Sequence, residues 1–210
     1  MALDIEGISK FLAENEGKRK FKQTVELAIN FKGIDFAKQD NRINIDVILP
    51  NGKGKTRKVA VFSNDRNLSD EARKNGIEVI DGSDMEAISK DPARLNSLLD
   101  YELVAQPALM PAIARSMGQF LGPRNKMPRP LVGSMSLTSV ATELNKRITL
   151  RNRGKNLPTL HCIVGNEDMD AAKICENVKE VLDSVLKKVG SSRVRSAYLK
   201  LTMSKPLRIA

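Results

Sequence analysis

Two stretches near the start of the chain alternate between apolar and polar positions. In residues 25–31 every second side chain is large and apolar, and Glu26 is one of the residues between them. Residues 43–49 repeat this pattern, and Pro-Asn-Gly follows at 50–52. A period of two is typical of strands with one buried face. Both stretches are therefore predicted to be strands, and Glu26 is predicted to lie on the open face of the first.

Helical spacing of apolar residues appears at both ends of the chain. It predicts a helix over residues 4–15, ended by Gly17, and a long helix over 169–189. Short apolar runs predict further strands at 160–164 and 196–202. Both ends of the chain therefore combine strands with helices in an α+β pattern.

The middle of the chain has a different pattern, in which short apolar runs alternate with helical segments. Strands are predicted at 59–62, 77–80 and 103–105, and helices at 69–75, 84–90, 108–117 and in a segment that ends at 143–146. Strands that alternate with helices indicate a parallel sheet covered by helices.

Charge follows the same division. The 210 residues carry 35 Lys and Arg against 25 Asp and Glu, a net charge of +10. Residues 63–153 hold 13 basic and 11 acidic side chains, so +8 of the +10 lies in the flanks. We predict that residues 1–62 and 154–210 form one discontinuous domain, with 63–153 inserted as a second. A single large α/β domain is the alternative that the alternation also permits.

Composition excludes several classes of protein. No apolar run approaches the roughly 18 residues of a membrane span, and the N-terminus lacks the pattern of a signal peptide. Cys162, Cys175 and the single histidine, His161, match no metal-site spacing. We expect no membrane, no metal and no cofactor, and a reducing cytoplasmic compartment. A basic surface of this size favours a nucleic-acid partner.

Basic side chains gather in two places, just before the first predicted strand and just after the last. Residues 18–24 surround Phe21 with cations, and the predicted last strand runs into a polar, basic tip. Hydroxyls, cations and exposed apolar side chains suit phosphates, ribose hydroxyls and base faces of RNA. We therefore expect the two ends to meet and to bind RNA through Lys20, Phe21, Lys22, Thr24, Glu26, Thr202, Met203, Ser204, Lys205 and Arg208.

A second basic segment lies in the middle of the chain. Residues 120–130 contain a glycine and three prolines, so they are predicted to be irregular. Arg124, Lys126 and Arg129 lie on this loop. Composition does not decide between a solvated loop and a secondary contact to RNA or tRNA.

An enzyme is the alternative function, with its site in the middle domain. Its support is the α/β pattern and an acidic group formed by Asp81, Asp84, Glu86 and Asp91. Such carboxylates also favour helix starts, and no nucleophile–base pair accompanies them. Gly-Lys-Thr at 54–56 lacks the first glycine of a phosphate-binding loop, since position 49 is leucine. We therefore predict a non-enzymatic protein.

Four sequence blocks stand out along the chain: Phe21-x-x-Thr24-Val25-Glu26-Leu27, Leu49-Pro50-x-Gly52-x-Gly54-Lys55, Gly122-Pro123-Arg124-x-x-Met127-Pro128 and Thr202-Met203. In residues and in order, over almost the whole chain, they resemble a known family, the large-subunit ribosomal protein L-one that forms the mobile stalk beside the tRNA exit site. The short N-terminus and the tail are similar to the archaeal and eukaryotic branch.

The resemblance implies an α/β (α+β) fold of two domains. The first would be a discontinuous split βαβ domain of ferredoxin or RRM type, and the second an inserted three-layer, Rossmann-like domain without a dinucleotide site. It implies a monomer when free, associated with the ribosome, that binds large-subunit rRNA, helps to release deacylated exit-site tRNA and represses its own mRNA. The family surface includes the residues matched by Phe21, Glu26, Thr202 and Met203, whereas Ser204 replaces the usual glycine.

Overall fold

The computed structural model describes residues 5–131, 136–152 and 157–209, and it divides the chain into two compact units. Unit 1 combines residues 1–55 with 146–210, and unit 2 is formed by residues 56–145. The divisions fall several residues before the expected 62/63 and 153/154. The reason is strand pairing, because β3 (Val59–Phe62) pairs with strands of unit 2 and β7 (Arg147–Arg151) pairs with a strand of unit 1.

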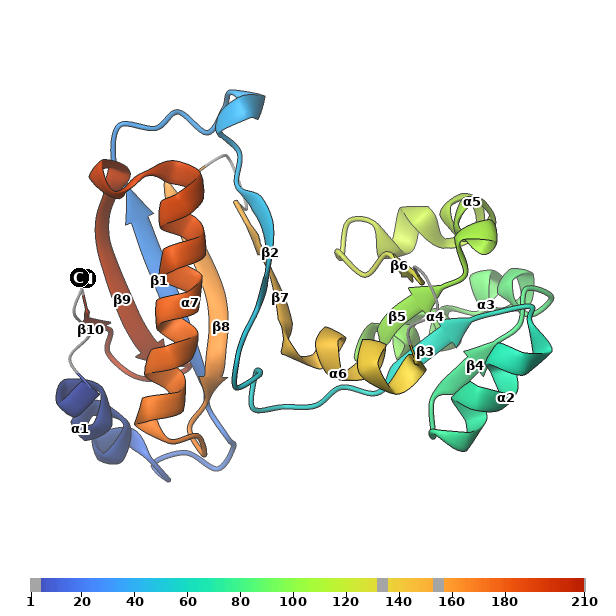
Figure 1. Cartoon of the computed structure of the whole chain (residues 1–210), viewed down its shortest axis with the longest axis horizontal. Coiled ribbons are helices and arrows are strands. Elements are labelled where there is room, and N and C mark those ends of the chain that lie inside the picture. Colours follow the sequence, from blue (N-terminus) through green and yellow to red (C-terminus); the bar gives the residue numbers. More distant parts are fainter. Residues whose placement is uncertain (1–4, 132–135, 153–156, 210) are drawn as a thin grey trace. The chain divides into compact units, whose positions relative to one another are not determined.

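Unit 1 contains an antiparallel sheet in the order β10-β9-β1-β8. The strands come from both ends of the chain, so residues far apart in the sequence lie side by side (Figure 1). Their bounds are β1 (Thr24–Phe31), β8 (Thr159–Asn166), β9 (Val194–Leu201) and β10 (Leu207–Arg208). The predicted strands at 25–31, 160–164 and 196–202 are confirmed, whereas β10 was not predicted.

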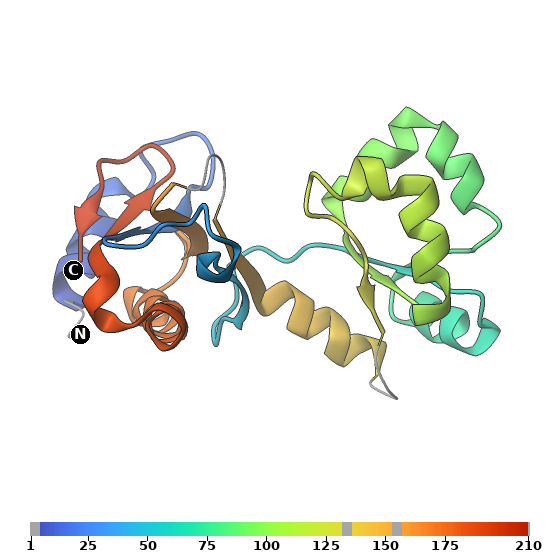
Figure 2. The ribbon, with the colours of Figure 1, turned by 90° about the horizontal axis from the view of Figure 1, so that it is seen from above.

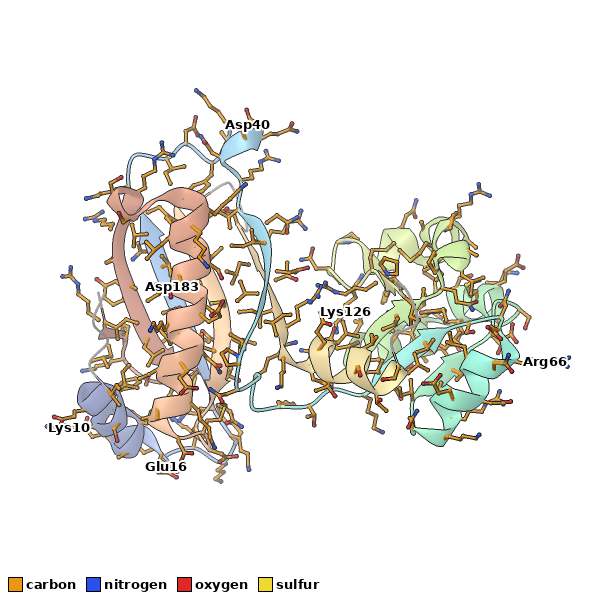
Figure 3. All side chains as sticks on the ribbon, viewed as in Figure 1. Lys10, Glu16, Asp40, Arg66, Lys126 and Asp183 are labelled. Atoms are coloured by element: carbon orange, nitrogen blue, oxygen red, sulfur yellow. The ribbon has the colours of Figure 1, made fainter. Side chains whose placement is uncertain are left out.

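One face of this sheet is covered by α7 (Ala171–Val189), as Figures 1 and 2 show. Apolar side chains of β1, β8 and β9 pack against α7 and α1 (Ile5–Asn15) in a single core. The opposite side of α7 is polar and carries Asp183, which is exposed (Figure 3). The predicted amphipathic helices at the two ends are thereby confirmed.

The other face of the sheet is here called the open face. Along β1 the odd-numbered residues from 25 to 31 are buried, while Thr24, Glu26, Ala28 and Asn30 are partly exposed. Successive side chains of a strand point to opposite faces, so these four lie away from α7. In the described part of the chain, the partly exposed residues of β8 and β9 continue this surface.

A second, two-stranded sheet of unit 1 pairs β2 (Asn44–Ile48) with β7. Val47, Ile148 and Leu150 are buried in the same core as α7. The predicted strand at 43–49 is confirmed, but its partner was missed because a helix runs directly into β7. That helix is α6 (Leu137–Lys146) of the preceding segment.

Unit 2 has three layers around a parallel sheet in the order β4-β3-β5-β6. Ala60 and Phe62 of β3 face the core under α3, α4 and α5, whereas Val59 and Val61 face α2 and α6. The remaining helices and strands of unit 2 are α2 (Arg66–Lys74), β4 (Glu78–Ile80), α3 (Met85–Lys90), α4 (Pro92–Ser97), β5 (Glu102–Ala105), α5 (Met110–Leu121) and β6 (Arg129–Pro130). Short 3-10 turns occur in unit 1 at Gln39–Asn41 and Ser191–Arg193, and in unit 2 at Leu98–Asp100 and Pro107–Leu109.

The expectation that residues 120–130 are irregular was wrong at both ends. Helix α5 continues through Leu121, and β6 adds Arg129 and Pro130 to the edge of the sheet. A proline is tolerated there because an edge strand does not need every backbone N–H for pairing.

Candidate nucleic-acid interface

The two basic segments meet at one end of the β1–β9 pair. The backbone N–H of Thr24 donates to Oγ1 of Thr202 at 3.1 Å, and the N–H of Met203 donates to Oε1 of Gln23 at 3.1 Å. We call residues 18–23 the arm, residues 202–206 the tip, and the two together the arm–tip patch. Phe21 is two residues from Gln23, so it lies within about 7 Å of it along the chain. The predicted meeting of the chain ends is confirmed.

Gln23 holds this junction together, although its side chain was not predicted to have a role. It is 2% exposed. Its Nε2 donates to the carbonyl of Asn15 at 3.3 Å and to Oε2 of Glu167 at 3.2 Å, while its backbone carbonyl accepts from the N–H of Glu167 at 3.0 Å. Helix α1, the β8–α7 loop and the tip are thus bonded to a single buried amide.

Phe21 and Met203 are large apolar side chains that remain exposed, at 50% and 56%. Exposed side chains of this size are costly to hydrate unless a partner covers them. The cations Lys20 and Lys205 near them in sequence are exposed as well. An apolar centre with cations beside it matches the faces of ribose and base together with the phosphates around them.

Lys22 is exposed but paired. Its Nζ donates to a carboxylate oxygen of Asp168, and this hydrogen bond raises the pKa of Lys22. The pair joins the arm to the β8–α7 loop. Lys22 therefore keeps its positive charge, but a phosphate would have to compete with Asp168 for it.

The hydroxyls of the tip point back to the chain. Oγ1 of Thr202 accepts from Thr24, and the hydroxyl of Ser204 accepts from the N–H of Leu201 at 2.9 Å and lies 3.0 Å from the carbonyl of Lys205. Asn125 is the one non-glycine residue with a positive φ in the described segments, so Ser204 adopts an ordinary conformation. Ser204 thus stabilises the turn that follows β9, and this turn does not need glycine.

Glu26 lies on the open face as expected, and it has a partner that the sequence did not suggest. It is directly opposite Lys200 on β9, and the two side chains approach to 3.7 Å. The carboxylate is about one-third exposed. The pair balances the carboxylate on a basic surface and leaves it accessible to a donor from solvent or ligand.

Further along the open face lie two rings that were not predicted to contact RNA, next to Arg208, which was predicted to do so. Tyr198 of β9 and His161 of β8 are the neighbours of Ala28 on either side, and Arg208 of β10 is opposite Tyr198. His161 is exposed, whereas Cys162 is buried, because successive side chains of a strand point to opposite faces. The sequence signal that could have placed Tyr198 on the open face is its position two residues before Lys200 in an alternating strand, because such residues share a face.

The second basic segment gives a mixed result. Arg124 is exposed, and its guanidinium lies 4.0 Å from the ring centroid of Phe120. Lys126 is only 15% exposed; its Nζ donates to the carbonyl of Tyr101 at 2.9 Å and lies 3.8 Å from Glu102. Burial lowers the pKa of Lys126. Lys126 therefore makes a hydrogen bond within unit 2 and is poorly placed for a phosphate. Arg129 is only partly exposed.

The acidic group of unit 2 is used by local structure. Oδ1 of Asp91 accepts from the N–H of Ala93 at 2.9 Å and so caps α4, and Oδ1 of Asp81 accepts from the N–H of Ser83 at 3.2 Å. Among the described residues, no cluster of three His, Cys, Asp or Glu could hold a metal ion, and no helix is long and apolar enough to span a membrane. Asp81 and Asp91 thus stabilise a turn and a helix start, as the simpler interpretation predicted, whereas Asp84 precedes α3 without a side-chain cap hydrogen bond.

The units differ completely in charge. Residues 56–145 contain 11 basic and 11 acidic side chains, so the whole net charge of +10 belongs to unit 1. With the expected boundaries at 62/63 and 153/154, the flanks held +8 of the +10. With the boundaries at 55/56 and 145/146, unit 1 holds all of it. The fold and its patch define a two-unit α/β protein whose discontinuous unit carries a basic, partly apolar surface.

Comparison with known proteins identifies the family. The sequence model of the Ribosomal protein L1p/L10e family matches residues 12–205. Similar proteins include the large ribosomal subunit protein uL1 of Thermococcus kodakarensis, 38% identical over 100% of this chain and 99% of that protein, and of Pyrococcus horikoshii, 36% identical over 100% and 98%. The uL1 protein of Methanocaldococcus jannaschii is 35% identical over 91% of this chain and 88% of its own.

The chain belongs to the Ribosomal protein L1p/L10e family. The resemblance stated from the four sequence blocks is thereby confirmed, and these relatives are archaeal. The prediction of a non-enzymatic protein is also confirmed, since the family consists of ribosomal proteins. The roles of individual residues in binding stay predictions.

Proposed function

We propose that this protein is a structural constituent of the large ribosomal subunit and binds rRNA through unit 1. Family membership supports a place in the large ribosomal subunit. The arm–tip patch is the observation that supports unit 1 as the rRNA-binding surface. Exposed Phe21 and Met203 lie at a junction of two chain ends, in the unit that holds all the net charge. Localisation would be cytoplasmic, on the ribosome.

Each part of the patch has a chemical role in this proposal. Phe21 and Met203 cover sugar and base faces, while Lys20, Lys22, Lys205 and Arg208 contact phosphates. Glu26 accepts from a base amine or a 2′-hydroxyl. Thr24, Thr202 and Ser204 hold the patch in shape through the hydrogen bonds described above, so they position the contacts.

The family resemblance supports finer proposals about the rRNA segment, the exit-site tRNA, the protein's own mRNA and the free state. The bound rRNA segment forms the mobile stalk beside the tRNA exit site, and the protein assists the release of deacylated tRNA there. A similar element in its own mRNA is bound and its translation repressed. Of the three predicted loop cations, Arg124 is the exposed one, so it is the residue proposed for a contact of unit 2 with RNA or tRNA. The free protein is a monomer.

Binding of a labelled stalk fragment of large-subunit rRNA to the full chain tests the central proposal. Met203→Ala should weaken binding by about 1–3 kcal/mol with an unchanged dependence on salt, because it removes an apolar contact. Ile48→Ala is the matched control, since Ile48 is 47% exposed on β2. Equal affinities for the two variants would reject the patch.

A further inference from the structure

The open face of unit 1 contains a small floor with aromatic side walls. Ala28 lies at the centre and is partly exposed, with Tyr198 as its neighbour on β9 and His161 as its neighbour on β8. Side chains directly opposite one another share a face, so all three project from the side away from α7. The side chain that lies between these two positions of the sheet is a single methyl group.

The spacing of the rings suits one planar group. Adjacent strands are about 4.8 Å apart, so Tyr198 and His161 originate about 9.6 Å apart. Offset-stacked aromatic rings have centroids at least about 4.5 Å apart, so a ring in contact with both walls needs about 9 Å. A single nucleobase fits this width, whereas a base pair in a duplex presents only an edge.

The ends of the floor are lined by hydrogen-bond acceptors. Glu26 and Asn30 lie two residues before and after Ala28 on β1 and share its face. The amide nitrogen of Asn30 donates to Oγ of Ser196 at 3.1 Å, which leaves its oxygen for a ligand. Glu26 presents a carboxylate beside Lys200. Two acceptors select a base that carries an exocyclic amino group.

We propose that this part of the open face binds one unpaired, amino-bearing nucleobase, stacked between Tyr198 and His161 over Ala28. The inference rests on the proposed RNA-binding function and extends it, because Glu26 belongs to both the face and the expected RNA surface. Arg208, opposite Tyr198 on β10, provides a cation beside the base for the adjoining phosphate. The ligand is an extruded adenine, cytosine or guanine of a folded RNA.

Mononucleotides test the proposal on the full chain without knowledge of the RNA. The chain has one histidine, so the ring protons of His161 are resolved directly by proton NMR. Adenosine and cytidine 5′-monophosphates should shift these signals at several-fold lower concentration than uridine 5′-monophosphate. Ribose 5-phosphate should leave them unmoved. Equal effects of ribose 5-phosphate and the nucleotides would show phosphate binding only and would overturn the proposal.

Variants separate this inference from the proposed function. Ala28→Ile fills the floor with a residue that suits a strand, and it should weaken binding of the rRNA stalk fragment about tenfold without changing the salt dependence. Tyr198→Phe should bind as the natural chain does, and Tyr198→Ala should bind like Ala28→Ile. Tight rRNA binding that tolerates both Ala28→Ile and Tyr198→Ala refutes the base site alone. Absence of rRNA binding by the natural chain refutes the proposed function. In that case the NMR titration with mononucleotides still decides whether the base site exists.

Discussion

Replacing Gln23 with methionine tests whether a buried amide holds the arm and the tip together. Methionine fills a similar volume but makes none of the three side-chain hydrogen bonds, to Asn15, Glu167 and Met203. Each such bond contributes about 1 kcal/mol net, for a total of about 3 kcal/mol. The partners lie near the surface and regain water, so we expect the unfolding free energy of unit 1 to fall by about 2 kcal/mol.

The chain offers a clean assay for this change. It has no tryptophan and two tyrosines, Tyr101 in unit 2 and Tyr198 in unit 1. In a Tyr101→Phe background, tyrosine fluorescence during urea unfolding reports on unit 1 alone. Gln39→Met is the matched control, because Gln39 is exposed, and it should change the unfolding free energy by less than about 0.5 kcal/mol.

The same variant should also bind RNA less tightly, because Met203 loses the acceptor that fixes its backbone. We expect about tenfold weaker binding of the stalk fragment and faster hydrogen exchange of the Met203 amide. A destabilised unit 1 with unchanged RNA affinity would refute the positioning role. An unchanged unfolding free energy would show that the three side-chain hydrogen bonds of Gln23 do not stabilise unit 1.

Three further predictions concern the tip, unit 2 and the core. Lys205→Ala should flatten the plot of log affinity against log salt concentration by about one unit, whereas Glu26→Ala should leave its slope unchanged; equal slopes in a salt titration would contradict the assigned roles. Lys126→Met should lower the stability of unit 2 by about 1–2 kcal/mol in urea unfolding, because the carbonyl of Tyr101 loses its donor, and should leave RNA affinity unaltered; weaker RNA binding would restore Lys126 as a contact. Burial raises the pKa of Cys162 to about 12, so the folded chain keeps this proton when the unfolded chain has lost it. Stability from this group is therefore complete below about pH 9 and declines as pH rises towards 12, and Cys162→Ala should show a smaller decline in urea titrations across that range; an identical decline in both proteins would exclude the thiol as its source.

Local patterns were sufficient for β1, β8 and β9, the three long strands of the open face. The alternation in residues 25–31 predicted β1 and placed Glu26 on the exposed side, because a half-buried strand requires a period of two. In contrast, β7 follows α6 without a turn residue between them, so its alternating residues were not recognised as a strand.

Tertiary contacts account for what the sequence did not predict. Gln23 is important because Asn15, Glu167 and Met203 converge on it, and these partners lie up to 180 positions from it in the sequence. Lys126 was predicted as a loop cation, but Tyr101 and Glu102, at the start of β5, enclose it. The base site was missed because it depends on the register that puts Tyr198 and His161 beside Ala28.

Salt-dependent binding of the rRNA stalk fragment to the natural chain and to a Phe21→Ala, Met203→Ala double variant tests the account most directly. We predict tight, salt-sensitive binding by the natural chain, a loss of at least about thirtyfold in the variant, and parallel salt plots, because two apolar contacts each contribute about 1–3 kcal/mol while the phosphate contacts remain. Equal affinities for the two proteins at every salt concentration would contradict the claim that the joined ends of the chain grip RNA.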